Sequence, residues 1–299
     1  MAAEAFVKIK SQELQIPFAN LASAFVIETF LSDLEKSEYK EFLWLKNAGS
    51  LDPEHYRRKP LLHLEFYYRC NPKVKAEAGI VPGQKISREL VDNMLEQIFA
   101  VDGSDSVVWK YLIQQEQGNY RIGLTAEIGS MQVPVTILLE NLQNEKLEPY
   151  QAPVPLLMKE SNEITLLQYP MEYIVADGLA DILEMLELIN DMERYQHVYT
   201  IAARETLDGR KIQQQLAVRC HEKKISYEER RIKMLESYRG YAYMRKKWNL
   251  FLKSENRKAP SWEEVLDKVH SLLSPIWKMS VEDMIFIGDW MPELKRYLD

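Results

Sequence analysis

The chain has 299 residues, enough for one large or two modest domains, and its 46% hydrophobic and 28% charged content excludes a disordered protein. The net charge of −7 argues against a protein that coats nucleic acid over its whole surface. The sequence has no apolar run of the roughly 18 residues that a membrane span needs, no signal-peptide pattern at its start and no CxxC pair, so we expect a cytoplasmic protein without membrane partners, whose two cysteines are reduced.

The first half of the chain has a mixed pattern of helices and strands. In chain order it predicts a helix from about residue 19, a buried strand in 41–45, a turn at 47–50, a strand at 61–69, a polar turn at 71–83, a helix at 87–100 and strands at 120–129 and 131–140. Ser87 is the expected N-cap of the second helix. Gly129 and Ser130 predict a hairpin between the last two strands.

The second half is predicted to be helical. The proline-rich stretch 149–155 has the composition of a linker. Beyond Pro170 the apolar spacing predicts helices in the following segments: 171–189, 193–207, 208–224, 226–254 and 261–278. The fold class is therefore α+β, with an α/β core in residues 1–150 and a helical C-terminal domain in residues 151–299.

A basic segment lies within this acidic protein. Residues 204–258 hold 16 Lys and Arg against seven Asp and Glu, a surplus of +9, which leaves −16 for the remainder. Such a segment predicts a surface for a nucleic acid or a protein partner, although a solvated helix with ordinary ion pairs has the same composition. The candidate residues are Arg230, Arg231, Arg245, Lys246 and Lys247. In the same segment, helical spacing predicts that Tyr241, Met244, Trp248 and Phe251 pack in the core.

Two chemically useful side chains alternate on the predicted strand 61–69. His63 and Glu65 are two residues apart and therefore point to the same face of the strand. Together they suit Mn²⁺ or Zn²⁺ better than Mg²⁺. His197 is a candidate third ligand, or else a hydrogen-bonded structural residue.

The order of several motifs resembles the nucleotidyltransferases of the AbiEii/AbiGii toxin family, the toxins of type IV toxin–antitoxin systems. The matching segments are "EFLWLKNAGSL" at 41–51, "LLHLEF" at 61–66, "YRIGLTAEIGSMQVPVTILLE" at 120–140 and "YPMEYIVADGLADIL…ERYQHVYTI" at 169–201. The resemblance implies a nucleotidyltransferase fold with a small mixed sheet and a setting in prokaryotic phage defence. It also implies Mg²⁺ or Mn²⁺ held by strand aspartates, with a nucleoside triphosphate bound beside them.

The matched positions depart from the family pattern. By this resemblance Gly49, Ser50, Asp177 and Arg194 are nucleotide-binding residues. The family's strand aspartates, helix lysine and later Lys and Asp positions are replaced as follows: His63, Glu65, Leu138, Gly178, Gln196, His197 and Thr200. A shift of two residues on the last strand keeps its face and makes Glu140, rather than Leu138, the third acid.

We therefore expect a catalytically degenerate member of this fold that binds a protein partner or a nucleic acid and needs no cofactor. The alternative is an active transferase, in which His63 and Glu65 hold Mg²⁺ or Mn²⁺, Ser50 contacts phosphate and Arg194 neutralises charge. Its acceptor would be an RNA 3′ end or a protein. A third possibility is a structural subunit of a larger complex, and the oligomeric state is left open.

Overall fold

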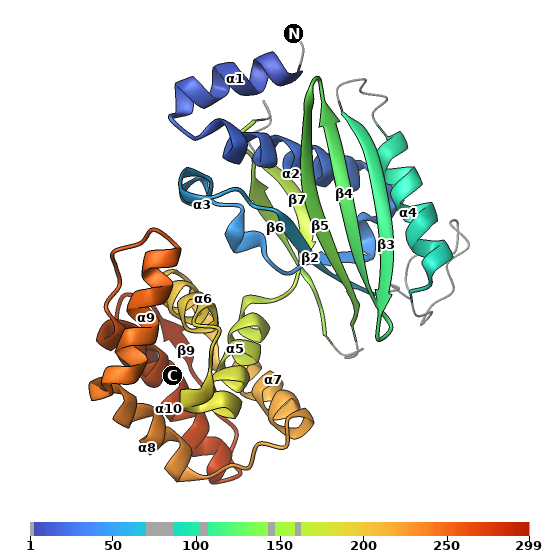
Figure 1. Ribbon diagram of the computed structural model, residues 1–299. Helices are drawn as coiled ribbons and strands as arrows, with labels where there is room; N and C mark the ends of the chain where they lie inside the picture. Colours follow the sequence, from blue (N-terminus) through green and yellow to red (C-terminus); the bar gives the residue numbers. More distant parts are fainter. Residues whose placement is uncertain (1–2, 70–85, 102–106, 143–146, 159–162, 299) are drawn as a thin grey trace. The chain divides into compact units, whose positions relative to one another are not determined.

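The computed structural model describes residues 3–69, 86–101, 107–142, 147–158 and 163–298, and the chain divides into two units, Met1–Tyr169 and Pro170–Asp299 (Figure 1). This division falls later than the expected boundary after residue 150. The reason is that residues 150–155, predicted as a linker, form a strand of the first unit's sheet; the linker prediction was wrong.

The first unit contains a seven-stranded mixed sheet with the order β3-β4-β5-β2-β1-β7-β6. Strand β2 runs parallel to β5, and β1 runs parallel to β7; the other neighbours are antiparallel. The strands are β1 (Leu43–Leu45), β2 (His63–Tyr68), β3 (Val108–Glu116), β4 (Asn119–Ile128), β5 (Met131–Asn141), β6 (Tyr150–Pro155) and β7 (Glu163–Gln168). The α+β fold class is confirmed, whereas β3, β6 and β7 were not predicted.

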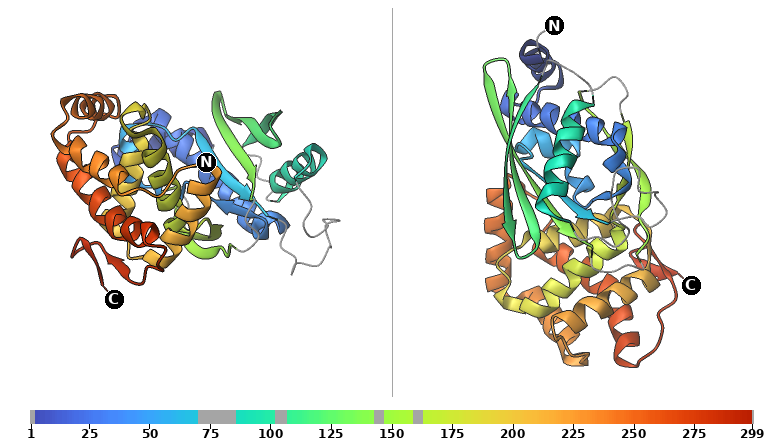
Figure 2. Two further views of the ribbon diagram at one scale, coloured as in Figure 1. Left: turned by 90° about the horizontal axis from the view of Figure 1, so that it is seen from below. Right: turned by 90° about the vertical axis from the view of Figure 1, so that its right-hand side faces the viewer.

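Helices cover one face of this sheet (Figure 2). The helices of the unit are α1 (Ala3–Leu14), α2 (Phe18–Lys36), α3 (Pro53–Arg58) and α4 (Arg88–Ala100), with short 3₁₀ turns at Glu38–Glu41 and Ala48–Ser50. Helix α2 is buried over most of its length and packs on β5 and β7, while α4 packs on β3. The Glu28 carboxylate of α2 accepts hydrogen bonds from the backbone N–H groups of Leu157 and Met158 at 2.7 and 2.8 Å. These bonds hold the segment after β6 against the core.

Two local predictions for this unit are confirmed. The Ser87 hydroxyl accepts the backbone N–H of Leu90 at 3.2 Å and caps α4. Strands β4 and β5 meet at a two-residue turn in which Gly129 has a φ of 59°, the conformation that favours glycine at the first position of a type II′ hairpin.

The second unit is helical with a small three-stranded sheet in the order β10-β9-β8. Its elements are α5 (Met171–Met185), α6 (Glu193–Arg204), β8 (Leu207–Asp208), α7 (Gly209–Glu222), α8 (Glu229–Ser237), α9 (Ala242–Ser254), α10 (Trp262–Val281), β9 (Asp289–Met291) and β10 (Arg296–Leu298), with 3₁₀ turns at Leu186–Leu188 and Tyr238–Gly240. The helical prediction is confirmed except for the strands and for the segment 226–254. That segment was predicted as one helix but forms α8 and α9, which are separated by the 3₁₀ turn and by Tyr241 in an extended conformation.

Buried tryptophans hold the second unit together. Trp248, Trp262, Trp277 and Trp290 are fully buried, and each indole N–H donates to a backbone carbonyl at 2.7–3.0 Å. Such pairing is what a buried indole requires. Met244 is also buried as predicted, whereas Tyr241 is 45% exposed and does not belong to the core.

No single helix in the described part of the chain has the length and apolarity to cross a membrane. Helices α1 and α2 together meet both criteria, but they meet at a bend of 119°, and α2 is a core helix of the first unit. Cys220 is a buried free thiol, while Cys70 and the turn predicted at 71–83 lie outside the described residues.

Candidate functional site

The face of the sheet opposite α2 carries the predicted site. On β2 the residues Leu64, Phe66 and Tyr68 point into the core and are buried, so His63 and Glu65 point to the other face, as predicted. Because β2 and β5 are parallel, with Glu65 opposite Leu138 and Tyr67 opposite Glu140, these side chains all share one face. The alternative acid Glu140 therefore belongs to the same surface as Glu65.

A lysine that was not predicted lies at the centre of this group. Lys46 follows β1, and its Nζ is 3.3 Å from Glu140 Oε1, 3.5 Å from Glu65 Oε2 and 4.3 Å from the centre of the Tyr67 ring. Its side chain is 18% exposed. Burial alone would lower the Lys46 pKa, but attraction to Tyr67, Glu140 and Glu65 outweighs burial, and the pKa is raised above its ordinary value. The ammonium group is therefore charged at neutral pH.

The next residue, Asn47, fixes the backbone of β2 beside the lysine. Its Nδ2 donates to the carbonyl of His63, and its Oδ1 accepts the N–H of Glu65, both at 3.1 Å. The backbone N–H of Lys46 also donates to the carbonyl of Glu65 at 2.8 Å. Together these bonds continue the pairing of β1 with β2 past the end of the strand and hold Glu65 in place.

This arrangement does not fit a divalent metal. Mg²⁺ requires several oxygen ligands in near-octahedral geometry, yet both carboxylates face the ammonium group of Lys46, and Leu138 supplies no ligand. His63 Nε2 lies 3.8 Å from Glu65 Oε1, so the predicted pair is in contact. Within the ranges that the structure describes, no three His, Cys, Asp or Glu side chains are placed to share an ion.

The turn with Gly49 and Ser50 is open to solvent, but backbone N–H groups in and next to it are hydrogen-bonded within the turn. A Cβ on Gly49 would meet no atom within 4 Å, so a ligand can approach the backbone there. However, the N–H of Ser50 donates to the Asn47 carbonyl at 2.9 Å, and the N–H of Leu51 donates to the Ala48 carbonyl at 3.0 Å. Two of the amides that a phosphate would need are therefore already used within the turn.

In the second unit, Asp177 and Arg194 take part in ion pairs. Asp177 Oδ1 accepts from Gln215 Nε2 at 3.0 Å and lies 3.2 Å from Arg219 Nε. Arg194 Nε lies 3.3 Å from a carboxylate oxygen of both Asp181 and Asp191. Each residue thus joins neighbouring segments of its own unit.

The position of the family's helix lysine is closed by packing. A Cβ on Gly178 would lie 2.8 Å from Val198 Cγ2, because α5 and α6 approach closely at this point. Gln196 is buried and donates to Thr200 Oγ1 at 2.8 Å. His197 is about half exposed and lies 3.5 Å from Glu193 on the same helix. These three positions provide contacts within α5 and α6.

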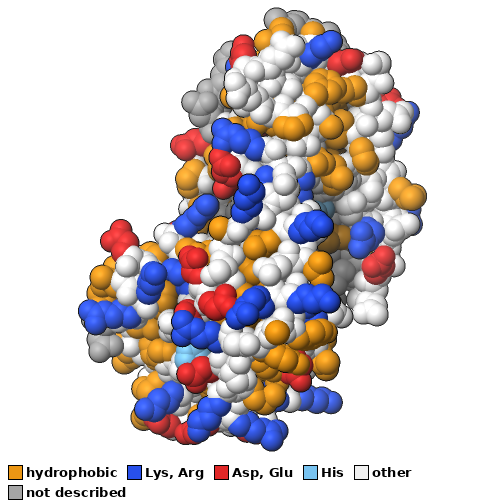
Figure 3. All heavy atoms as spheres, turned by 60° about the vertical axis from the view of Figure 1, so that its left-hand side comes forward, with side chains coloured by type: hydrophobic (Ala, Val, Ile, Leu, Met, Phe, Trp, Pro, Cys, Tyr) orange, Lys and Arg blue, Asp and Glu red, His pale blue; other side chains and the backbone are white. Residues whose placement is uncertain are grey.

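Four of the five basic candidates are engaged within the second unit. Arg230 and Arg245 lie 2.6 and 2.5 Å from Glu228 and Glu263. Arg231 donates to the carbonyl of Leu183, and Lys247 to those of Glu187 and Ile189. Lys246 is exposed, with no partner in the described residues. On the face in Figure 3, positive side chains are interspersed with acidic and apolar ones rather than forming a continuous basic surface.

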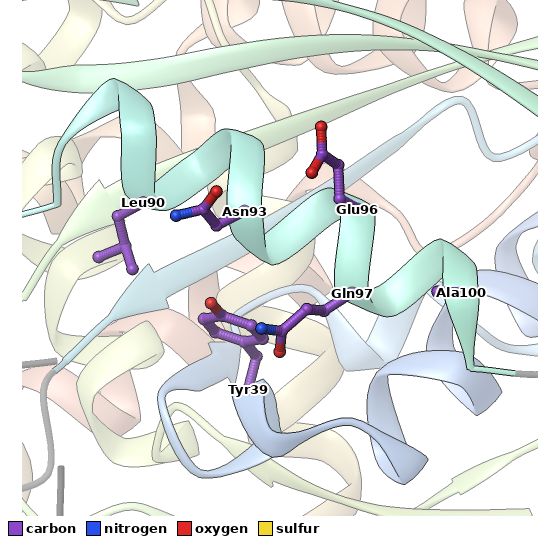
Figure 4. Close-up of a pocket in the computed structure, with 6 residues that line it drawn as sticks. All are labelled: Tyr39, Leu90, Asn93, Glu96, Gln97 and Ala100. Carbon is purple, nitrogen blue, oxygen red and sulfur yellow. The ribbon is translucent and has the colours of Figure 1, made fainter. Parts of the chain in front are cut away.

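A pocket of about 260 Å³ lies elsewhere, between α4 and the 3₁₀ turn at Glu38–Glu41 (Figure 4). It is lined by Tyr39, Leu90, Asn93, Glu96, Gln97 and Ala100. Burial raises the pKa of Tyr39, so its phenol is neutral. The predicted site residues do not line this pocket.

The residues that prediction missed are Lys46 and Asn47, together with the role of Tyr67. One signal was available for Lys46: it directly follows the buried run Leu43–Leu45, and a charge next to buried strand residues needs a partner. The partner itself was not predictable, because Glu140 becomes a neighbour only through the parallel pairing of β2 with β5.

Comparison with known proteins gives distant similarities only. No protein-family model matches the chain, and no curated protein matches it. Among solved structures, JHP933 from Helicobacter pylori is similar at 12% identity over 90% of this chain and 95% of that chain, with a TM-score of 0.49. A second H. pylori structure, provisionally named a nucleotidyltransferase, is similar at 12% identity over 88% and 96%, with a TM-score of 0.46. The AbiEii/AbiGii resemblance stays a prediction.

Proposed function

We propose that this chain is a nucleotidyltransferase-like protein that no longer transfers nucleotides and acts by binding a protein partner. The observation that carries the proposal is the position of Lys46, whose ammonium group lies between Glu65 and Glu140. By the resemblance of the sequence motifs, Glu65 occupies one of the strand positions from which the family holds its metal ions. Glu140 occupies another if the match on the last strand is shifted by two residues from Leu138, and it lies on the same face as Glu65.

Electrostatics explains why this arrangement opposes catalysis. A divalent cation at the two carboxylates would be repelled by the charged Lys46 a few ångströms away, and the raised pKa of that lysine opposes its neutralisation. Displacing the side chain would separate a largely buried ammonium group from two counterions and an aromatic ring. Lys46 thus supplies the positive charge that a metal would otherwise bring, but it neither coordinates phosphate oxygens in octahedral geometry nor activates a hydroxyl.

Two observations support a protein rather than a nucleic acid as the partner. Four of the five basic candidate residues already make bonds within their own unit, which reduces the charge available for phosphates. In addition, the C-terminal segment exposes large apolar side chains, which are typical of protein contacts: Met284, Ile285, Ile287, Leu294 and Leu298. The order of the sequence motifs favours a prokaryotic toxin–antitoxin or phage-defence setting in the cytoplasm.

A nucleotidyl-transfer assay tests the loss of catalysis. The purified chain is incubated with each labelled nucleoside triphosphate, Mg²⁺ or Mn²⁺, and tRNA, beside a Glu65→Ala variant and an established transferase as positive control. We expect no transfer above the level of the variant. Transfer that disappears in Glu65→Ala would show an active enzyme, with His63 and Glu65 in the roles that the alternative gives them.

Binding of labelled tRNA, followed by fluorescence anisotropy at several salt concentrations, tests the class of partner. We expect weak binding that the Lys246→Glu variant leaves unchanged. Tight, salt-dependent binding that Lys246→Glu weakens would instead make RNA the partner of the second unit.

A further inference from the structure

The two edge strands of the seven-stranded sheet differ in their ability to pair. Strand β6 carries Pro153 and Pro155, which lack the N–H needed to extend a ladder. Strand β3 (Val108–Glu116), at the opposite edge, has nine residues and no proline. Long edge strands of this kind are usually blocked in proteins that remain single.

The backbone of β3 presents an ordered row of polar groups at this edge. A two-residue turn joins β3 to β4, with positive φ at Gln117 and Gly118, so Glu116 and Asn119 form a hydrogen-bonded pair. Hydrogen-bonded and non-hydrogen-bonded pairs then alternate along the hairpin, so every second residue of β3 directs its backbone N–H and C=O away from β4. The N–H and C=O groups that point outward belong to Trp109, Tyr111, Ile113 and Gln115, and the described residues provide them with no further backbone partner.

The side chains of β3 add apolar surface beside this row. Val108 and Leu112 are 55% and 63% exposed, and both lie on the face of the sheet that α2 and α4 leave uncovered. A strand added to this edge would cover part of Leu112 while satisfying the outward backbone groups.

We propose that the occupant is a second copy of this chain, with the two β3 strands antiparallel and Ile113 opposite Ile113 on the two-fold axis. In this register the outward groups of Tyr111 meet those of Gln115 in the other copy. Lys110 lies opposite Glu116, and the symmetry repeats that charge pair on the other side of the axis. The inference is independent of whether the site in the first unit is catalytic.

The two charge pairs between Lys110 and Glu116 favour this register and a second copy of the chain as the occupant. Centring the two-fold on Leu112 or Tyr111 also keeps the outward groups paired, but it places Lys110 opposite Gln114 or Leu112 and loses both charge pairs. Within the chain Lys110 already lies 2.6 Å from Glu127, and Glu116 lies 3.7 Å from Arg121. Because Lys110 and Glu116 are exposed, each can keep its partner within the chain and also contact the oppositely charged residue of the other copy.

Sedimentation equilibrium of the full chain over a range of concentrations tests the proposal. We expect the wild type to dimerise, and Lys110→Glu or Glu116→Lys alone to weaken the dimer by roughly tenfold, because each creates two like-charge pairs. Mixing the two variants should restore dimers. The introduced glutamate of one chain then faces the introduced lysine of the other, and the two native side chains face each other.

Two further variants test the backbone pairing and the position of the charge effect. Gln115→Pro removes an outward N–H without touching the β3–β4 ladder and should yield monomers with an unchanged circular dichroism spectrum. Lys253→Glu makes the same charge change as Lys110→Glu on an exposed lysine of α9 and should leave the dimer intact. A wild type that stays monomeric, a dimer that survives Gln115→Pro, or mixed variants that do not associate would each overturn the proposal.

Discussion

The ammonium group of Lys46 lies 3.3 Å from the carboxylate of Glu140, a residue 94 positions later in the chain. The contact spans β2, because Lys46 follows β1 while Glu140 is near the end of β5. It therefore joins three adjacent strands at the point where the sequence predicts a metal site. The carboxylates of Glu65 and Glu140, which could hold a metal ion, are here paired with Lys46 in a contact that stabilises the sheet.

Replacing Lys46 by methionine should destabilise the first unit. Lys46→Met keeps the apolar stem but leaves Glu65 and Glu140 near each other without their counterion, and we expect a loss of about 1–2 kcal/mol at pH 7. The measurement is urea unfolding followed by circular dichroism. Lys10→Met, which removes an exposed lysine beside Glu13 on α1, is the matched control and should change stability by less than about 0.5 kcal/mol. Equal effects of the two substitutions would contradict a stabilising role for Lys46.

The effect of Lys46→Met should depend on pH in one direction. The pKa of Lys46 is raised above its ordinary value of 10.5 in the folded state, so the folded chain holds this proton more tightly than the unfolded chain. The stabilisation is complete below pH 10.5 and is lost as the pH rises through the raised pKa. The difference in unfolding free energy between wild type and Lys46→Met should thus be constant from pH 7 to 9 and shrink by pH 11. A difference that grows with pH would exclude the ion pair as its cause.

Metal binding should appear when the lysine is removed and the missing acid is supplied. Leu138 lies opposite Glu65 on the face that also carries Glu140, so the double variant Lys46→Met, Leu138→Asp places three carboxylates together without an ammonium group. We expect it to bind Mn²⁺, detected by electron paramagnetic resonance, whereas the wild type binds none at the same concentration. Leu138→Asp alone is the control, and binding by that variant would show that Lys46 does not exclude the ion.

Close packing of α5 on α6 should make position 178 intolerant of any side chain. In Gly178→Ala the new Cβ would lie 2.8 Å from Val198 Cγ2, and the strain should exceed the helix-propensity gain of alanine, with a net loss of about 1–2 kcal/mol. Thermal unfolding measures the loss. Adding Val198→Ala should make the Gly178→Ala substitution less costly than it is in the wild type, and additive effects would argue against the contact.

The thiol of Cys220 should be unreactive in the folded protein. It is 1% exposed, and burial raises its pKa to about 11, so little thiolate forms at pH 8. In a Cys70→Ser background, a disulfide reagent should label the native chain much more slowly than the urea-unfolded chain. Equal rates would mean that the second unit opens readily around α7.

The elements that were predicted correctly depend on local rules. Helix α4 follows from the Ser87 cap and its apolar spacing, and the β4–β5 hairpin follows from Gly129 between two alternating runs. Strand β6 was misread because prolines usually end regular structure, yet an edge strand tolerates them where no neighbour needs the N–H. Strand β3 was missed because its open face also carries the apolar Val108 and Leu112, so its sequence lacks the strict apolar–polar alternation that identifies a half-buried strand.

In the candidate site, too, the features that depend on neighbouring residues in the sequence were predictable, and those that depend on contacts between distant segments were not. That His63 and Glu65 share a face follows from the two-residue period of a strand. That Glu140 stands beside them depends on which strands are neighbours, and this information is spread over the whole first unit. The reason for Gly178 is likewise a contact between two helices, which the spacing within α5 alone does not reveal.

Pro153 and Pro155 on β6 also set a limit on growth. A sheet with two pairable edges can add copies without end and form a fibre, whereas this sheet offers one such edge among its described strands. Two-fold pairing through β3 consumes that edge in both copies. The two prolines therefore make the pair a closed assembly, in which concentration raises the number of dimers and not the length of a polymer.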